Sequence, residues 1–321
     1  MILLWGLTGD GPFDAVRAAL ARRGAEVALL DQRQILETEV ELRVEPALHA
    51  AVWMRDERIE LDDARAVYWR TYDLRRLPAV IAAGPDSGAI EAASLVEEAL
   101  VVWMELTSAR VVNRASNMAS NGSKPYQMEI LRAHGFSVPR TLVTTDPDAA
   151  RRFWTDCGAV VYKSVSGVRS VVARLGDAHF DRLDEVSWCP TQFQQYVPGR
   201  DHRVHVVGDD IFACEVVSEA DDYRYAAGRG DPPTLRACKL PADVEKRCFA
   251  LARALSLPLA GIDLRRAPDG RWFCFEVNPS PGFTYYEAHT GHPIGDAIAG
   301  YLMGGGARSE VLLEEGNRQV A

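Results

Sequence analysis

GIDLRRAPDGRWFCFEVNPSPG, residues 261–282, is the stretch of this chain that constrains the fold most strongly. A Pro-Asp-Gly turn signal at 268–270 separates two runs in which apolar and polar residues alternate. Alternation with a period of two is typical of half-buried strands. The stretch therefore predicts a β-hairpin whose loop runs from Ala267 to Gly270.

A four-residue loop would fix the register of this hairpin. Ile262 would then pair with Phe275. Leu264 would pair with Phe273, and both pairs would share one apolar face with Val277. The other face would carry Asp263, Cys274, Glu276 and Asn278.

Three residues of that second face carry oxygen donors. Neighbouring and diagonal positions on one face of an antiparallel pair lie within about 8 Å, so their side chains can converge on one ion. The carboxylates of Asp263 and Glu276 and the amide oxygen of Asn278 are hard ligands that suit Mg²⁺, with water and phosphate oxygens completing the shell. A solvated hairpin face without a metal is the alternative interpretation.

Composition sets the frame for the rest of the chain. Its 321 residues correspond to roughly two domains of ordinary size, and 47% apolar residues are enough for a folded core. A net charge of −9 argues against a nucleic-acid partner and against an anionic membrane surface. The six cysteines show no C-x-x-C pairing, which indicates free thiols and a cytoplasmic protein. We find no signal peptide and no apolar run of about 18 residues that could span a membrane.

The N-terminal third of the sequence predicts a small open parallel sheet. Its expected elements are the strands 2–5, 26–30 and 66–69 and the helices 13–23 and 89–107. Gly6, Gly9 and Gly11 follow the first strand, but their spacing is not G-x-G-x-x-G, so tight turns explain them better than a dinucleotide site. Residues 117–123 are small and polar, which predicts a linker or an active-site loop.

The remainder predicts mixed helices and strands. The expected helices are 124–133, 147–157 with Asp146 as N-cap, and 242–255. The expected strands are 141–143, 159–163, 170–175, 192–197, 203–207 and 211–217. From Gly304 onward the chain is glycine-rich and then weakly patterned, which is typical of a frayed tail.

Two segments of this region are suited to binding a nucleotide. Lys163 ends an apolar strand just before the small residues 164–167, so its charge could meet polyphosphate while backbone N–H groups cover it. A snorkelling surface lysine is the alternative. Residues 194–199 have the pattern of a strand that turns out of its sheet, which frees backbone groups to pair with a flat heterocycle; an ordinary edge strand is the alternative.

Taken in this order, the motifs resemble those of the ATP-grasp superfamily. The similarity is greatest to α-glutamate-type carboxylate–amine ligases and to the graspetide (microviridin-type) ligases that crosslink ribosomal peptides, and it runs from about residue 112 to 302. The matching text is VVNRASNMASNGSKPYQMEILRAHGFSVPRTLVTTDP (111–147), VVYKSVSG (160–167), QFQQYVPGRDHRVHVVGDDIFA (192–213), GIDL (261–264) and FEVNPSPGF (275–283). Tyr68-Trp69-Arg70 also resembles a strand motif of the peptide-crosslinking branch.

The resemblance implies a fold and a role for particular residues. It implies an α/β ATP-grasp fold in which an N-terminal parallel-sheet domain (1–112) precedes a central lid (113–190), a C-terminal domain (191–304) and a tail (305–321). Arg203 and Arg224 would stabilise phosphate charge, and Asp263, Glu276 and Asn278 would bind two Mg²⁺. ATP would be held by Lys124, Lys163, Ser164, Ser166, Gly167, Gln195, Tyr196, Val197 and Asp201. Gln195 stands where many relatives carry Glu, and residues 229–239 match no pattern of the family.

The activity that the resemblance implies is ligation through an acyl phosphate. A carboxylate would attack the γ-phosphate of ATP, and an amine or hydroxyl would then displace phosphate to give an amide or ester. The substrate would be a ribosomal peptide, or alternatively free amino acids or other small carboxylates. A non-catalytic nucleotide-binding protein is the third possibility. Relatives that pair make a homodimer a further expectation.

Overall fold

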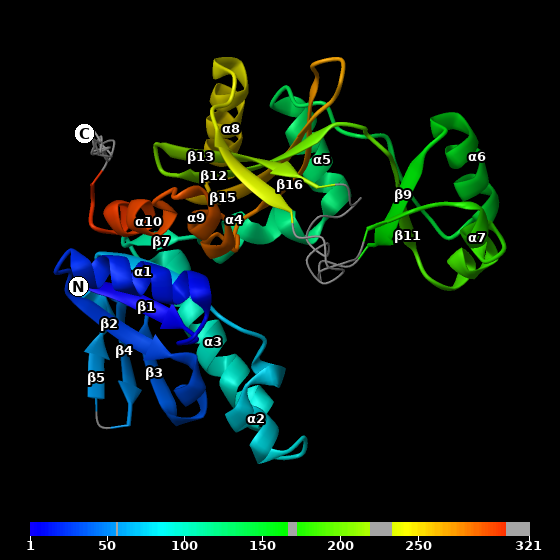
Figure 1. Ribbon diagram of the computed structural model, residues 1–321. Helices are drawn as coiled ribbons and strands as arrows, with labels where there is room; N and C mark the ends of the chain where they lie inside the picture. The colour runs from blue at the N-terminus through cyan, green and yellow to red at the C-terminus, as the bar shows by residue number, and fades with distance from the viewer. Residues whose placement is uncertain (56, 166–171, 219–232, 306–321) are drawn as a thin grey trace, which may run out of the picture.

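The structure, a computed structural model, describes residues 1–55, 57–165, 172–218 and 233–305 (Figure 1). The mixed α/β class predicted from the sequence is confirmed, and so is the parallel N-terminal sheet. That sheet has the order β2-β1-β6-β7 and contains β1 (Ile2–Gly6), β2 (Val27–Asp31), β6 (Ala66–Arg70) and β7 (Arg110–Val112). Its main helices are α1 (Gly11–Arg22) and α3 (Ala89–Leu106).

Helix α1 begins where the sequence supplies an N-terminal cap. The Asp10 carboxylate accepts a hydrogen bond from the Phe13 N–H at 3.1 Å, and Pro12 occupies the first turn, where a missing N–H costs nothing. Phe13, Val16 and Leu20 recur at helical spacing and are fully buried. The helix is therefore fixed at its start by the cap and along its length by one apolar face.

A second, antiparallel sheet in the N-terminal part was not predicted. It contains β3 (Thr38–Arg43), β4 (His49–Met54) and β5 (Glu57–Glu60) in the order β3-β4-β5. Its buried residues Val52 and Ile59 join the core that packs against Trp103 of α3. Short helices α2 (Pro78–Ala83) and α4 (Ala115–Met118) follow, and 119–122 forms a 3-10 turn, so residues 117–122 are helical instead of a loop.

The middle of the chain forms a four-stranded antiparallel sheet with the order β10-β9-β11-β8. Its strands are β8 (Thr141–Thr144), β9 (Val160–Ser164), β10 (Ala173–Arg174) and β11 (Thr191–Gln195). Helix α5 (Lys124–Ala133) precedes it, and α6 (Pro147–Cys157) and α7 (Asp177–Phe180) pack on it. Figure 1 shows this sheet standing at one end of the molecule. The division of the chain at 112, 190 and 304 stays a prediction.

A five-stranded antiparallel sheet with the order β14-β13-β12-β15-β16 forms the C-terminal part. Its strands are β12 (Arg200–Val207), β13 (Asp210–Val217), β14 (Thr234–Cys238), β15 (Leu259–Arg266) and β16 (Trp272–Asn278). The helices are α8 (Ala242–Ala254), α9 (Thr284–Thr290) and α10 (Ile294–Leu302). Strand β14 lies within residues 229–239, the stretch that matched no pattern of the family. Residues 306–321, which belong to the predicted tail, lie outside the described part of the chain.

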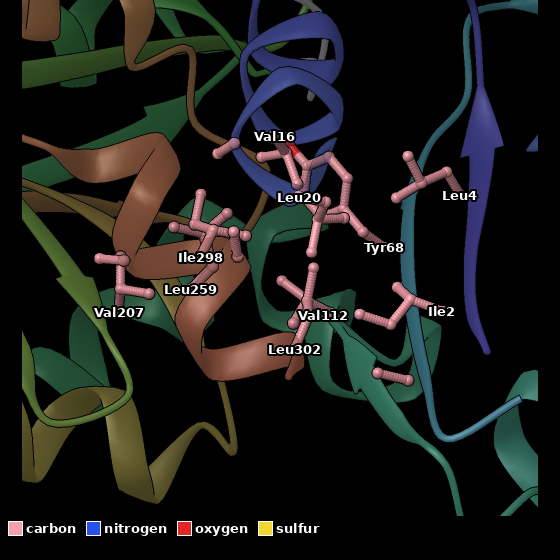
Figure 2. Close-up of a cluster of buried hydrophobic side chains, with 14 of the residues drawn as sticks. Ile2, Leu4, Val16, Leu20, Tyr68, Val112, Val207, Leu259, Ile298 and Leu302 are labelled. Atoms are coloured by element: carbon pink, nitrogen blue, oxygen red, sulfur yellow. The ribbon is translucent and has the colours of Figure 1, made fainter. Parts of the chain in front are cut away.

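One hydrophobic cluster joins the N-terminal and C-terminal parts (Figure 2). Ile2 and Leu4 of the first strand and Leu20 of α1 meet Ile298 and Leu302 of α10 there. These five side chains are at most 7% exposed. Because the cluster removes apolar surface of both parts from water, it fixes the N-terminal sheet against the C-terminal sheet.

The register predicted for the 261–282 hairpin is wrong. Ala267 N–H donates to the Arg271 carbonyl at 2.9 Å, so the loop contains one residue fewer than expected between its closing pair. Leu264 consequently pairs with Cys274 instead of Phe273, and a bulge then makes Asp263 pair with Glu276. Cys274 is fully buried in the core beneath the sheet, not on the face of Asp263, and burial raises the pKa of its thiol well above the usual range.

In the described residues no helix is long and apolar enough to cross a membrane.

Candidate active site

The hairpin bulge brings two carboxylates opposite each other. Leu264 of β15 pairs with Cys274, but the neighbouring Asp263 pairs with Glu276. Phe275 is therefore the extra residue on β16. Such a bulge re-aims the side chains beside it. Phe275 and Glu276 both line the same cleft as Asp263, while Cys274 and Val277 stay in the core. Asn278 follows two residues on, opposite Gly261.

The cleft lies between the middle sheet and the C-terminal sheet and encloses about 720 Å³, including the space at its mouth. The middle sheet contributes Lys163 and Gln194, and the C-terminal sheet contributes Asp263 and Glu276. The connection between the two sheets, which includes Tyr196 and Val197, lines it as well.

Arg203 is buried beside the acidic pair. Its Nη1 donates to Oδ1 of Asp263 at 2.6 Å, and its guanidinium lies 5.6 Å from the ring centroid of Tyr286. Only 6% of Arg203 is exposed, so the ion pair is weakly screened. The neighbouring His205 is 1% exposed, and burial together with the Arg203 charge lowers its pKa well below the usual value. Arg203 is therefore a buried cation paired with Asp263, which lines the cleft, and the lowered pKa of His205 favours its neutral form.

Gly261 creates the space that the Arg203 guanidinium occupies. A Cβ at position 261 would lie 2.4 Å from Nη2 of Arg203 and 2.6 Å from Cβ of Pro281. Both distances are far below a van der Waals contact. The glycine is thus required by close approach of a side chain, although its own backbone conformation is ordinary.

If the chain has the ATP-dependent activity that the sequence resemblance implies, we expect Gly261→Ala to lower turnover about 100-fold, because a shift of about 1 Å in a group at the site can cost this much. The rate of ADP release measures the effect. Gly122→Ala is the matched control, since a Cβ there meets no atom within 4 Å. Equal rates for the two variants would contradict the role given to the space beside Arg203.

The connection between the two sheets is held by Arg265. Its Nε and Nη2 donate to the two oxygens of Asp201 at 2.6 and 2.7 Å, and its Nη1 donates to the Val197 carbonyl at 2.9 Å. The guanidinium of Arg174 lies 3.8 Å from the ring centroid of Tyr196. Arg265 therefore fixes the backbone of this segment from the C-terminal sheet.

The backbone of this segment leaves one N–H for a ligand. Gln195 N–H donates to the Arg140 carbonyl and Tyr196 N–H to the Ala159 carbonyl, at 2.8 and 2.9 Å. The N–H of buried Val197 meets no acceptor in the described part of the chain. A buried donor of this kind needs a partner, which a heterocycle in the cleft would supply.

We expect Arg265→Met to raise KM for ATP about tenfold, because hydrogen bonds to charged groups contribute roughly 1.5–3 kcal/mol. The value of kcat should change little, since Arg265 holds the Val197 backbone, to which no part in the chemical step is assigned. Initial-rate kinetics with varied ATP separate the two constants. Arg266→Met, whose side chain is exposed on the same strand, is the control. An unchanged KM in Arg265→Met would refute this role.

The other residues predicted for the site are distributed as follows. Gln195 lines the cleft, but its Oε1 also accepts a hydrogen bond from the Arg140 N–H at 3.4 Å. Ser164 ends β9. Lys124 begins α5 and is not among the described residues that line the cleft. Ser166, Gly167 and Arg224 lie outside the described residues.

Two groups of residues at the site were missed by the sequence analysis. Arg265 has no local signal, because its partner Asp201 is 64 residues away and meets it only through the pairing of β12 with β15. Arg70 and Asn113 contact the segment after Asn278 from the N-terminal part. The Tyr-Trp-Arg motif at 68–70 was the one sign that this strand takes part in the site.

The donors at the acidic end fit a hard divalent cation. Asp263 and Glu276 offer carboxylate oxygens and Asn278 an amide oxygen, the ligand chemistry that Mg²⁺ prefers. In the described part of the chain no three His, Cys, Asp or Glu side chains come together as a complete metal cage. An open donor set of this kind agrees with Mg²⁺, which keeps waters and takes phosphate oxygens as ligands.

A second cavity lies beside the acidic end. It encloses about 520 Å³ and is lined by Trp69, Arg70 and Thr71 of the N-terminal part and by Pro279 and Ser280 of the C-terminal part. It opens at the carboxyl ends of the parallel strands β6 and β7, where α/β proteins commonly bind ligands. Glu276 lines the first cavity, and Pro279 and Ser280 of the same segment line the second.

Comparison with known proteins identifies the architecture around this cleft. The sequence profile of the RimK-like ATP-grasp domain matches residues 121–302, more than half of the chain. The chain belongs to the RimK-like ATP-grasp family. It is an ATP-grasp ligase, a class of enzymes that uses ATP and Mg²⁺.

Its relatives by sequence include two kinds of glutamate ligase. A probable alpha-L-glutamate ligase of Sodalis glossinidius is 28% identical over 236 residues, which cover 70% of this chain and 77% of that protein. The ribosomal protein bS6–L-glutamate ligase of Escherichia fergusonii is 29% identical over 234 residues, covering 70% and 76%.

Solved structures with the same fold include peptide-modifying ligases. The ATP-grasp ligase PsnB, complexed with a phosphomimetic variant of its minimal precursor, Mg and ADP, is 26% identical with a TM-score of 0.79, covering 94% of this chain and 97% of PsnB. The macrocyclase MdnC of Microcystis aeruginosa, bound to the precursor peptide MdnA, superposes with a TM-score of 0.80 over 95% of this chain and all of MdnC. Its 23% identity shows the fold alone.

Proposed function

We propose that this ATP-grasp ligase modifies a peptide by joining a side-chain carboxylate to an amine or hydroxyl. The observation that carries the proposal is that the segment 276–280 lines two cavities, with Glu276 in the cleft between the sheets and Pro279 and Ser280 in the cavity at the edge of the N-terminal sheet. The second cavity leaves room for an extended chain beside the reacting phosphate. PsnB, whose structure contains a precursor peptide, supports this choice through its similarity over nearly the whole chain.

The nucleotide would lie in the larger cleft with its base against the segment 195–197. The unpartnered N–H of Val197 would donate to the base, and the ring of Tyr196 lies beside it. Lys163 is 8% exposed and lines the same cleft, so its ammonium would contact the phosphates. Lys124, Ser164, Ser166, Gly167 and Asp201 remain proposed contacts from the family pattern.

Asp263, Glu276 and Asn278 would hold two Mg²⁺. The ions would neutralise the negative charge that develops on the phosphoryl group during its transfer. Arg203 is held at 2.6 Å from Asp263 and would add a fixed positive charge at the same end. Arg224 is proposed to assist it. The chain itself contributes alignment and electrostatics and forms no covalent intermediate with the substrate.

The chemistry would proceed in two steps. The substrate carboxylate attacks the γ-phosphorus of ATP, so that ADP leaves and an acyl phosphate forms. An amine or hydroxyl then attacks the acyl carbon, phosphate leaves with the bonding electrons, and the nucleophile loses its proton. Arg203 and Lys163 are at most 8% exposed, so the interaction of their charges with the phosphates would be weakly screened by water.

The test is Mg²⁺-dependent nucleotide turnover with separate pools of acidic peptides that contain Thr, Ser and Lys, and of free amino acids. We expect ADP and phosphate with the peptide pool, and a loss of one water per link in the mass of the product. AMP and pyrophosphate would refute the acyl-phosphate route. Turnover with the amino-acid pool alone would refute peptide modification.

That second outcome would favour ligation of free amino acids or other small carboxylates. The alpha-L-glutamate ligases among the relatives are the reason to keep this candidate. We also propose a homodimer, by analogy with pairing relatives, and a cytoplasmic location, because the six cysteines are free thiols in the structure.

A further inference from the structure

The segment that follows Asn278 is held by the N-terminal part of the chain. Asn113 donates through Nδ2 to the Pro279 carbonyl at 2.5 Å and to the Leu259 carbonyl at 2.7 Å. Pro281 is buried, and Phe283 is fully buried in the cluster shared with α1. Residues distant in the sequence therefore fix the backbone immediately beyond the acidic hairpin.

Arg70 is the charged group in this contact. Its Nη1 donates to Oγ of Ser280 at 2.9 Å, to the Ser280 carbonyl at 3.1 Å and to the Pro281 carbonyl at 3.3 Å. Its Nε donates to Oδ2 of Asp10 at 2.7 Å, and the Arg70 side chain is 19% exposed. Asp10 is itself fixed, because it caps α1 by accepting from the Phe13 N–H. The guanidinium is thus bound to Asp10 on one side and donates hydrogen bonds to the backbone carbonyls of residues 280 and 281 on the other.

Ser280 connects the Arg70 contact to Asn278 through a hydrogen bond. The Ser280 N–H donates to Oδ1 of Asn278 at 2.9 Å, so the position of residue 280 decides where the Asn278 amide points. A continuous series of hydrogen bonds consequently runs from the N-cap of α1 through Arg70 and Ser280 to Asn278. Hydrogen-bond partners of metal ligands commonly orient them in this way.

We infer that Arg70 is a positioning residue for the metal end of the cleft, where it aims Asn278 through Ser280. The inference rests on the proposed function, in which Asn278 contributes a ligand oxygen. The Asp10 carboxylate balances the guanidinium, so a cation is placed near the metal site without a net positive charge. The N-terminal part thereby sets the affinity of the C-terminal sheet for the divalent ion.

The test is Mn²⁺ binding to the full chain in the presence of ADP, followed by the electron paramagnetic resonance signal of free Mn²⁺. We expect Arg70→Met and Arg70→Lys each to weaken Mn²⁺ binding about tenfold, the lower end of the range for lost partners of metal ligands. Lysine keeps the charge beside Asp10 but lacks the planar fork that reaches both Asp10 and Ser280. In turnover assays the Mg²⁺ requirement should rise by the same factor, while kcat at saturating Mg²⁺ stays within about threefold.

Arg22→Met is the matched control, because Arg22 also joins the two parts of the chain, through Asp296 at 3.1 Å, away from the cleft. It should bind Mn²⁺ like the unaltered chain. Thermal unfolding monitors the fold of each variant, and Arg70→Lys serves where Arg70→Met does not fold. If folded Arg70 variants bind Mn²⁺ with unaltered affinity while Asp263→Asn loses binding, the inference about Arg70 is refuted and the proposed metal site is retained. Unaltered affinity in Asp263→Asn as well overturns the proposed metal site and the inference with it.

Discussion

Glu276→Gln is expected to lower ADP release by about 10³-fold with the fold intact, because a metal-ligand charge at a transferring phosphoryl group contributes several kcal/mol. Glutamine preserves the volume of Glu276 and its place opposite Asp263, but it removes one of the two carboxylates at this end of the cleft. With that charge missing, the divalent ions are held less tightly and the phosphate charge is less well neutralised. The bulge at Phe275 needs no carboxylate, so the hairpin should keep its geometry.

The measurement is Mg²⁺-dependent ADP release with the substrate pool that gives the highest rate for the unaltered chain. Glu215→Gln is the matched control, since Glu215 belongs to the same sheet but pairs with exposed Arg200 outside the cleft. Turnover of Glu276→Gln close to that of the control would remove Glu276 from the metal site.

Arg203→Met is expected to reduce kcat by about 10²–10³-fold, the effect of deleting one preorganised group that stabilises transition-state charge. The same change should destabilise the fold by about 3–5 kcal/mol, because it leaves the Asp263 carboxylate buried without its partner. Asp263 is 20% exposed and Arg203 7% exposed at the side chain, so solvent compensates little. Arg203→Lys should recover only part of either effect, since an ammonium cannot reach Asp263 and pack on Tyr286 in the same way.

Thermal unfolding and single-turnover kinetics separate the two consequences. Arg200→Met on the same strand is the control, because Arg200 is 74% exposed and its ion pair lies at the surface. In the double variant Arg203→Met/Asp263→Asn the loss of stability should be smaller than the sum of the single losses. Strict additivity would show that the two side chains are not coupled.

Local signals explain why the hairpin and α1 were predicted and why the hairpin register was not. The turn at 268–270 and the helical spacing of the apolar residues in 13–23 are encoded by neighbouring residues, and both elements are present in the structure. The exact register depended on one backbone hydrogen bond in the loop and on a bulge at Phe275. A bulge shifts the alternation by one residue, and because residues 272–275 are all apolar the shift could not be recognised there.

The contacts that shape the site could not be predicted from local sequence patterns, because they join residues that are far apart in the chain. Arg265 and Asp201 become partners only when β12 and β15 pair, and Arg70 meets Ser280 across 210 residues. Strand β3 was missed although its sequence TEVELR alternates polar and apolar residues. Strand β4, HAAVWM, is a short and mostly apolar run, which periodicity alone cannot distinguish from a buried helix segment. Sequence therefore indicated which residue types belong to the site, and tertiary pairing determined how they are oriented.

The cluster shared by the first strand and α10 also dictates the order in which this protein can mature during synthesis. Ile2 and Leu4 are covered by Ile298 and Leu302, which the ribosome adds almost 300 residues later. Because synthesis adds about 5–20 residues per second, α10 is completed roughly 15–60 s after the first strand. Until α10 emerges, the part of this cluster that Ile298 and Leu302 cover stays open to water, and chaperones that bind apolar surfaces are expected to associate with it.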